Sequence, residues 1–361
     1  MAAMTTTVTL IPGDGIGPEV AAATTRVVDA LGAGVEWEVL DAGAPAIEAH
    51  GMPMPPHVID SIRRNRVALK GPVTTPVGTG FRSVNVALRQ DLDLFASVRP
   101  CRLYPGVQSR FDYVDIVVVR ENTEDLYEGI EFEQGSKELG KLRGYLNYMH
   151  GFPLARDAGV SVKPISVSAT RAIVEFAFEY AKRKRRRKVT LGHKANIMRF
   201  SDGVWLETGE KLAEEYRDVG FEATQVDELA MWLAWQPGEL DVIVLPNLYG
   251  DIISDLCAGL VGGLGVAPGM NLGKEHAVFE PTHGSAPDIA GRGLANPIAM
   301  ILSAVLMLRH LDMFPAAKRL EDAVAAVLAQ GPRPADLKPD GPPATTDQIA
   351  DAIVGRLQTG G

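Results

Sequence analysis

The chain has 361 residues, 46% of them hydrophobic and 22% charged, with a formal net charge of −9 at pH 7. This profile is typical of a globular protein with enough chain for two lobes, and it excludes a disordered chain. The negative charge argues against nucleic-acid and anionic membrane partners, and no stretch reaches the ~18–20 apolar residues of a membrane span.

The chain has two cysteines, Cys101 and Cys257, which favour a reducing compartment over a disulfide framework. The N-terminal residues 1–10 lack the basic region and apolar core of a signal peptide, and the Arg pattern of a transit peptide. We therefore expect a cytoplasmic protein, although a processed organellar protein would look the same.

Strand and helix patterns alternate along the chain. Short, β-branched apolar runs predict buried strands at residues 8–11, 67–69, 114–119, 189–191 and 241–245. Helices are predicted after Pro18, over residues 171–187, over 298–311 with Pro297 at its first position, and over 346–357. The alternation predicts an α/β fold with a largely covered sheet.

Two segments depart from this pattern. Residues 129–157 are rich in Gly and polar residues, which predicts an arm or insertion between lobes. Residues 182–188 are all Lys or Arg. Such a run could bind nucleic acid or act as an import signal, but we expect a solvated helix C-terminus, where cations interact favourably with the helix dipole.

The first glycine-rich turn, Gly13-Asp14-Gly15-Ile16-Gly17, follows a predicted strand. Its third glycine comes one residue too early for the G-x-G-x-x-G fingerprint, and no ribose-binding acid lies at the required distance. By itself this segment indicates only a tight turn.

Three arginines, Arg89, Arg99 and Arg120, follow or end apolar stretches, where a solvated arginine is less expected. Arginine binds carboxylates in a bidentate manner, and Asn85 can share a helix face with Arg89. Ser83 near a helix start can bind an anion, or it can cap the helix. As a group, these residues predict a pocket for a substrate with several carboxylates.

Asp251 and Asp255 are four residues apart, so they share a helix face if this segment is helical. Two close carboxylates repel each other unless a cation lies between them, and hard oxygen ligands suit Mg²⁺ or Mn²⁺. The alternative is a capping Asp followed by an exposed Asp.

Two other segments each allow two interpretations. Lys194 ends a predicted strand and is either a base with a lowered pKa or a surface lysine. Residues 280–289 form a Gly/Ser segment with His283 and Asp288, and this segment either wraps a nucleotide or is simply a loop.

These segments occur in the same order in the β-decarboxylating dehydrogenases, the family of isocitrate, isopropylmalate and homoisocitrate dehydrogenases. The resemblance covers residues 8 to about 311 and rests on LIPGDGIGPE, LKGPVTTPVG, VRENTEDLYEGIE, HKANIM, NLYGDIISDLCAGLVGGLG and HGSAPDIAG. It implies an α/β isocitrate/isopropylmalate dehydrogenase-like fold with two lobes, different from a standard Rossmann domain. The large lobe, residues 1–94 and 262–361, would hold the cofactor; the small lobe, 95–124 and 167–261, would form the dimer interface; an arm, 125–166, would clasp the partner.

The pattern of Ser83, Asn85 and Arg89 resembles the isocitrate enzymes, whereas isopropylmalate enzymes place apolar residues there and homoisocitrate enzymes usually lack the Ser/Asn pair. The resemblance therefore implies an NAD-dependent, decarboxylating isocitrate dehydrogenase and a homodimer with shared active sites. Isocitrate would contact Ser83, Asn85, Arg89, Arg99 and Arg120. The alternatives are isopropylmalate or homoisocitrate oxidation, or a non-catalytic regulatory subunit.

The resemblance also implies the chemical roles. Mg²⁺ or Mn²⁺ would bind Asp251, Asp255 and the partner subunit's Asp227. Lys194 with Asp227 would form the base, and Tyr127 would protonate the product enolate. NAD would contact Lys70, Thr74, Thr75, Asn196, His283, Gly284, Ser285, Ala286, Pro287, Asp288, Ile289 and Asn296. Asp288-Ile289 stands where NADP enzymes of the family resemble Lys-Tyr, which favours NAD.

Overall fold

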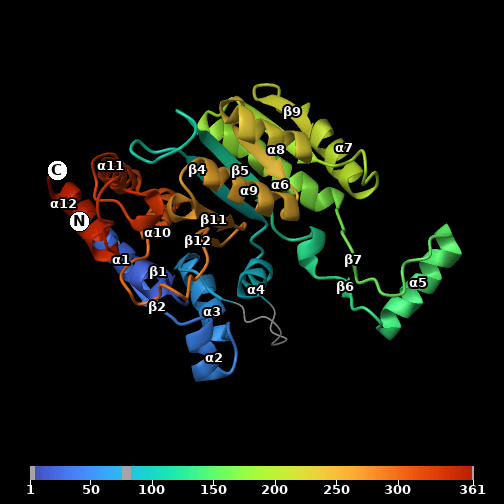
Figure 1. Cartoon of the computed structure of the whole chain (residues 1–361), viewed down its shortest axis with the longest axis horizontal. Coiled ribbons are helices and arrows are strands. Elements are labelled where there is room, and N and C mark those ends of the chain that lie inside the picture. Colours follow the sequence, from blue (N-terminus) through green and yellow to red (C-terminus); the bar gives the residue numbers. More distant parts are fainter. Residues whose placement is uncertain (1–4, 75–82, 360–361) are drawn as a thin grey trace.

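The computed structural model describes residues 5–74 and 83–359, so the predicted cofactor residue Thr75 lies outside the described part of the chain. Within that part, ten strands form one continuous sheet that crosses the molecule (Figure 1). In spatial order they are β2 (Val35–Val39), β1 (Thr6–Ile11), β3 (Val67–Lys70), β12 (Ala277–Pro281), β11 (Pro268–Leu272), β4 (Ala96–Arg102), β5 (Asp115–Glu121), β10 (Val242–Leu245), β8 (Lys188–His193) and β9 (Gly220–Gln225).

The sheet has a parallel half at each end, and antiparallel pairs join the two halves. Strands β2, β1, β3 and β12 are parallel to one another, as are β5, β10, β8 and β9. The pairs β12–β11, β11–β4 and β4–β5 are antiparallel. Three reversals in succession make the two parallel halves run in opposite directions. The carboxyl ends of β3 and β5 therefore lie at opposite edges of the sheet.

Helices cover the sheet, as the apolar strands require. They are α1 (Gly17–Asp29), α2 (Ala44–His50), α3 (Pro56–Asn65), α4 (Val84–Asp91), α6 (Val167–Lys184), α7 (Ser201–Ala213), α8 (Val226–Trp235), α9 (Asn247–Leu260), α10 (Ile298–His310), α11 (Phe314–Gln330) and α12 (Thr346–Thr359). The central strands β5 and β10 are almost completely buried, in agreement with their β-branched sequences. The chain termini lie near each other, beside α12 (Figure 1).

Helix α6 differs at both ends from the prediction over residues 171–187. It begins at Val167, because the Ser166 side chain caps it by accepting a hydrogen bond from the backbone N–H of Ala169 at 3.1 Å. It ends at Lys184, because Arg185 adopts a left-handed conformation with φ 55°. Helix α10 begins at Ile298, and Pro297 occupies the N-cap position that precedes the predicted one.

The basic run at residues 182–188 spans the end of α6 and the start of β8. Lys182 pairs with Asp218, Arg186 with both Asp115 and Asp241, and Lys188 with Glu222. These acidic partners agree with a solvated, charge-compensated helix end. None of the described helices is both long and apolar enough to cross a membrane.

Residues 129–157, predicted as an arm without a recognisable motif, contain regular structure. A short ribbon of β6 (Glu131–Phe132) and β7 (Val160–Ser161) carries the helix α5 (Lys137–His150), and Figure 1 shows this unit projecting from the body. Ser136 starts the helix by accepting a hydrogen bond from the backbone N–H of Leu139. Composition alone did not reveal this helix, because its apolar side chains mostly face solvent.

Candidate active site

Polar side chains gather on one face of the sheet at its centre. Arg120 on β5, Ser97 on β4 and Asn271 on β11 lie opposite one another in the strand register. Glu280 on β12 accepts a hydrogen bond from the Asn271 amide at 2.7 Å. All four side chains therefore face the same side, and α9 packs against β4 and β5 nearby.

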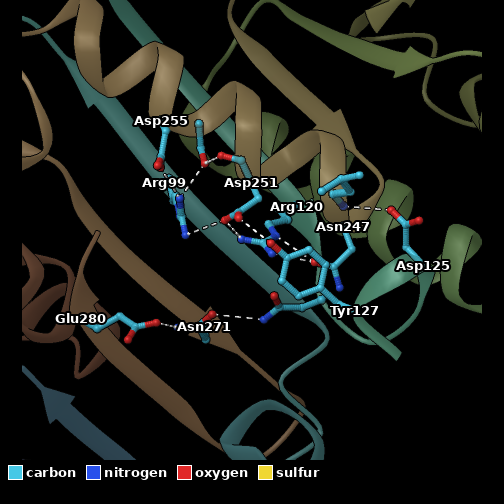
Figure 2. Close-up of polar contacts among 12 residues, drawn as sticks. Arg99, Arg120, Asp125, Tyr127, Asn247, Asp251, Asp255, Asn271 and Glu280 are labelled. Carbon is cyan, nitrogen blue, oxygen red and sulfur yellow. Dashed lines mark hydrogen bonds and ion pairs between the residues drawn. The ribbon is translucent and has the colours of Figure 1, made fainter. Parts of the chain in front are cut away.

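Asp251 on α9 is the centre of this cluster. The Tyr127 hydroxyl donates a hydrogen bond to Asp251 Oδ2 at 2.5 Å, and the buried Arg120 forms an ion pair with Asp251 Oδ1 (Figure 2). Arg120 also donates to Asn247 Oδ1 from Nε at 3.0 Å and from Nη2 at 2.8 Å. Burial would raise the pKa of Asp251, but Arg120, Tyr127 and nearby arginines outweigh it and lower that pKa.

Asp255 lies one turn further along α9, as the spacing predicted, and Asp251 is too far inside the helix to cap it. The Asp255 side chain is 55% exposed, and its Oδ1 atom pairs with Arg99 Nη1 at 3.0 Å. Burial and the negative charge of Asp251 raise the pKa of Asp255, while Arg99 opposes the shift. The two carboxylates thus repel each other, and the arginines compensate only part of that repulsion.

Three of the five predicted substrate residues line a cavity of about 140 Å³ beside this cluster, and Ser83 and Arg120 are not among its lining residues. Asn85, Arg89 and Arg99 all line it. Arg89 Nε and Asn85 Oδ1 are buried and have no hydrogen-bond partner in the described chain. Burial and the charge of Arg120 lower the pKa of Arg89 to about 10. Buried polar atoms without partners are costly, so the Arg89 N–H fits an anionic ligand and the Asn85 amide oxygen fits a hydrogen-bond donor on that ligand.

Ser83 occupies the N-cap position of α4, but its side chain makes no capping hydrogen bond. The capping alternative for Ser83 is therefore wrong in its usual form, in which the side-chain oxygen accepts a backbone N–H.

A buried ion pair missed by the sequence analysis forms another wall of the cavity. Lys70 Nζ lies 2.6 Å from Glu280 Oε2, and only 2% of the Lys70 side chain is exposed. Burial alone would raise the pKa of Glu280, but the charges of Lys70 and Arg89 outweigh it and lower that pKa to about 2. The signal available in the sequence was the acid at the end of an apolar strand, which is unusual without a partner.

The glycine-rich turn packs against two of the segments predicted to bind the cofactor. Asp14 Oδ2 accepts a hydrogen bond from the backbone N–H of Thr74 at 2.8 Å, and the Ile16 N–H donates to the carbonyl of Ser285 at 2.8 Å. Gly15 has φ 58°, and a Cβ atom there would lie 2.0 Å from the Ser285 carbonyl oxygen. The turn therefore needs glycine because the Thr74 and Ser285 segments pack directly against it.

Residues 283–289 follow β12 as a turn. His283 Nδ1 lies 2.9 Å from the Gly284 carbonyl oxygen, while its Nε2 atom is buried without a partner in the described chain. Burial lowers the pKa of His283. Ala286 accepts a hydrogen bond from the Ile289 N–H at 3.2 Å; Pro287 and Asp288 are exposed on this turn.

Three polar side chains hold the end of this loop. Asn296 Oδ1 accepts a hydrogen bond from the Ile298 N–H at 3.0 Å, so Asn296 does stabilise the start of α10. Its amide donates to Asp336 at 2.9 Å, and Glu19 accepts hydrogen bonds from the Gly293 and Ala295 N–H groups. Glu19 and Asp336 were not predicted, because their partners lie hundreds or tens of residues away in the sequence.

Lys194 and Asp227 form an ion pair outside the Asp251 cluster. Lys194 Nζ pairs with Asp227 Oδ1 and donates to Gln225 Oε1 at 3.2 Å. Their bond lowers the pKa of Asp227. Asn196 is exposed nearby. No hydrogen bond or ion pair in the described residues joins Lys194 or Asp227 to Asp251, and no three His, Cys, Asp or Glu there form a metal-ligand group.

The surface around α8 and α9 exposes large apolar side chains. Five of them belong to the Lys194 segment, α8 and α9: Ile197, Phe200, Met231, Trp235 and Ile252. Ile252 adjoins Asp251, and α8 contacts α9. Exposed apolar side chains in such number are typical of a protein interface.

Comparison with known proteins agrees with this geometry. Residues 7–353 match the model of the isocitrate/isopropylmalate dehydrogenase family. A catalytic subunit of NAD isocitrate dehydrogenase from Arabidopsis thaliana is 43% identical, covering 97% of this chain and 88% of that protein. A regulatory subunit of NAD isocitrate dehydrogenase from Dictyostelium discoideum is 44% identical, covering 90% of this chain and 84% of that protein. Both names carry the word mitochondrial.

Among solved structures, an isocitrate dehydrogenase from Methylococcus capsulatus matches with a TM-score of 0.90 and 46% identity, covering 98% of this chain and 100% of that chain. Sequence and fold therefore agree over nearly the whole length. The chain belongs to the isocitrate/isopropylmalate dehydrogenase family.

Proposed function

We propose that this protein oxidises and decarboxylates isocitrate to 2-oxoglutarate and CO₂, reducing NAD with the help of Mg²⁺ or Mn²⁺. The observation that carries the proposal is the cavity in which Arg89 and Arg99 meet the unpartnered Asn85 amide, beside the Asp251 and Asp255 carboxylates. Isocitrate has three carboxylates and a hydroxyl, so the arginine forks match its carboxylates and the Asn85 amide oxygen can accept a hydrogen bond from a donor on the ligand.

The donor set fits a divalent cation. Asp251 and Asp255 present hard oxygen ligands that repel each other, and Asp227 of the partner subunit would add a third. When bound, the cation would act as a Lewis acid on the substrate oxygens. Arg99 and Arg120 now offset the charge of Asp251, and they would then be free to bind the substrate carboxylates.

Two groups of this chain would move protons. Lys194, paired with Asp227, would take the proton of the substrate hydroxyl while hydride passes to NAD. Tyr127, held by Asp251 at 2.5 Å, would donate a proton to the carbon that loses CO₂. Burial and the hydrogen bond to Asp251 raise the pKa of Tyr127, so the phenol keeps its proton near neutral pH.

Lys194 and Tyr127 belong to separate clusters in one chain, so we propose a homodimer in which each site takes Lys194 and Asp227 from the partner. The exposed apolar surface on α8 and α9 supports this, and the arm with α5 would clasp the partner. The large lobe, small lobe and arm remain proposed as residues 1–94 with 262–361, 95–124 with 167–261, and 125–166. A cytoplasmic location also stays a prediction.

The cofactor side rests on Lys70, Thr74 and the 283–296 loop. We propose that His283 Nε2, which has no partner in the described chain, and the exposed Asp288 face NAD. Thr74 joins this loop, because its Oγ1 lies 2.5 Å from Ser285 Oγ.

Two alternatives make different predictions. A regulatory subunit, like the Dictyostelium relative, needs no complete set of chemical groups, whereas Tyr127, Lys194, Asp227, Asp251 and Asp255 are all present here. An isopropylmalate enzyme needs an apolar surface where this cavity has Asn85.

The test is a matrix of isocitrate, isopropylmalate and homoisocitrate against NAD and NADP with the purified chain alone, with and without Mg²⁺. We expect the highest kcat/KM for isocitrate with NAD, and none without metal. A chain inactive on all three acids would favour the regulatory alternative, and a preference for isopropylmalate would contradict the assigned substrate.

A further inference from the structure

A largely buried lysine, outside the roles described above, contacts one carboxylate near each of the two proton-transfer groups. Lys163 follows β7 at the base of the arm, and 12% of its side chain is exposed. Its Nζ atom lies 2.9 Å from Asp202 Oδ1 and 3.5 Å from Asp125 Oδ1, and both carboxylates are completely buried. It also lies 4.4 Å from the centre of the Tyr249 ring.

Asp125 connects this lysine to the Tyr127 side of the site. Asp125 Oδ2 accepts a hydrogen bond from the Leu248 N–H at 2.9 Å, and so holds the first turn of α9, which carries Asp251 (Figure 2). Asp125 itself has φ 69°, a conformation that needs support in a residue other than glycine. Tyr127 is two residues further on.

Asp202 connects the same lysine to the base. Asp202 Oδ2 accepts a hydrogen bond from the Lys194 N–H at 2.7 Å, which fixes the backbone from which the Lys194 side chain extends. The contacts of Lys163 meet the distance of an ion pair, but its Nζ atom lacks hydrogen-bond geometry toward either carboxylate. Lys163 therefore acts on both as a shared positive charge.

We propose that Lys163 is a positioning residue that holds the Tyr127 and Lys194 segments of one chain in a common arrangement. The inference rests on the proposed function. Because Lys194 would serve the partner's site while Tyr127 serves its own, the lysine would support half of each active site in the dimer. Two buried carboxylates without this charge would repel each other, and both segments would shift.

The first test is Lys163→Met, with Lys188→Met as the matched control. Lys188, at the start of β8, is also a partly buried lysine and pairs with Glu222 at 2.8 Å, at the opposite end of that strand from Lys194. We expect kcat of Lys163→Met to fall about 10- to 100-fold, as for a small misplacement of reacting groups, and kcat of the control to stay near the parent value.

Hybrid dimers show whether Lys163 supports one active site or both. A dimer of one parent chain and one Tyr127→Phe chain has one defective site and should keep about half of the parent activity, as each site works alone. A dimer of one parent chain and one Lys163→Met chain has both sites defective, so we expect well under half. Half the parent activity in this second hybrid would overturn the proposal.

A double variant distinguishes a loss of activity from a loss of stability. Lys163, Asp125 and Asp202 carry formal charges of +1, −1 and −1, and Lys163→Met/Asp125→Asn restores their sum of −1 while removing the shared lysine. We expect its thermal unfolding midpoint to recover toward the parent and its kcat to stay low. If kcat recovered together with stability, Lys163 would only compensate the charge of the two carboxylates, and the positioning role would be refuted. A parent without isocitrate turnover would instead refute the proposed function.

Discussion

At the scale of single residues, the site is organised by charge compensation between side chains. Arg120, Arg99 and Lys70 are each largely buried, and each contacts a carboxylate within the cluster. Buried cations need such partners, because removing one partner leaves an uncompensated charge that is strongly destabilising. The arrangement keeps a highly charged site folded and leaves Asn85 and Arg89 with unused polar atoms.

The Lys70–Glu280 pair should make stability depend on pH. The pKa of Glu280 is lowered from 4.5 to about 2, so its contribution is fully present above about pH 4.5 and is lost as the pH falls toward 2. We expect Glu280→Gln to be less stable than the parent at pH 7, with a gap that narrows below about pH 4.5. Urea unfolding at several pH values measures this gap, and a gap that widens in acid would contradict the assignment.

Tyr127 and Lys194 should fail at different steps. We expect Lys194→Met and Tyr127→Phe each to lose about 10²–10⁴-fold in rate, as acid–base groups do. Lys194→Met should be slow in hydride transfer. Tyr127→Phe should be impaired more in decarboxylation and protonation, because the hydroxyl that it lacks would supply the proton to the carbon that loses CO₂. Normal decarboxylation of supplied oxalosuccinate by Tyr127→Phe would show that the tyrosine has another role.

At the scale of elements, helix starts and loops carry the site. Helix α9 places Asp251 and Asp255 one turn apart, and Asp125 holds its first turn from outside the helix. Glu19 and the glycine-rich turn hydrogen-bond to the backbone of the 283–296 loop, and Asp336 accepts a hydrogen bond from the Asn296 side chain. Mobile loops position ligands poorly, and these contacts supply the rigidity that a cofactor site needs.

The cofactor loop should select NAD through Asp288-Ile289. A carboxylate accepts hydrogen bonds from a ribose diol and repels a 2′-phosphate, which needs Lys, Arg or Tyr donors. We expect the parent to prefer NAD, and Asp288→Lys/Ile289→Tyr to shift the ratio of kcat/KM values toward NADP. Asp288 is exposed and has no ion pair among residues 5–74 and 83–359, whereas Ile289 packs partly buried against the core, so a thermal unfolding midpoint near the parent value is the control for an intact fold. An unchanged ratio would place the discrimination elsewhere.

At the scale of the whole molecule, the proposed site would need residues from two chains. Asp251 and Asp255 have no third acidic neighbour in the described residues, while Lys194 and Asp227 form their own pair. The exposed Phe200 and Trp235 lie on the Lys194 and α8 side, where a second chain would cover them. A dimer would bury this apolar surface and complete the site in one step.

Subunit mixing tests this arrangement. Inactive Lys194→Met and inactive Arg89→Ala chains should regain activity when mixed. One site of the mixed dimer then takes its intact Arg89 from the Lys194→Met chain and its intact Lys194 from the Arg89→Ala chain. Tagged chains verify subunit exchange, and Lys194→Met mixed with itself is the control. Absence of recovery despite verified exchange would argue that each site is built from one chain.

Much of this protein follows from the sequence alone. The strands at residues 8–11 and 241–245, the Asp251/Asp255 helix face and the family resemblance all depend on short spacings, which local geometry converts directly into structure. The residue types of Arg89, Arg99 and Arg120 predict an anion site, and the structure places Arg89 and Arg99 on one cavity.

Only the tertiary structure decided which distant groups meet. The pairs Lys70–Glu280, Asp125–Lys163 and Asp202–Lys163 join separate segments, and no periodicity within a segment encodes such a contact. The antiparallel register of β11, β4 and β5 likewise places Asn271, Ser97 and Arg120 on one sheet face. The pKa values and unpartnered atoms of the site arise from burial, which depends on the packing of the whole chain.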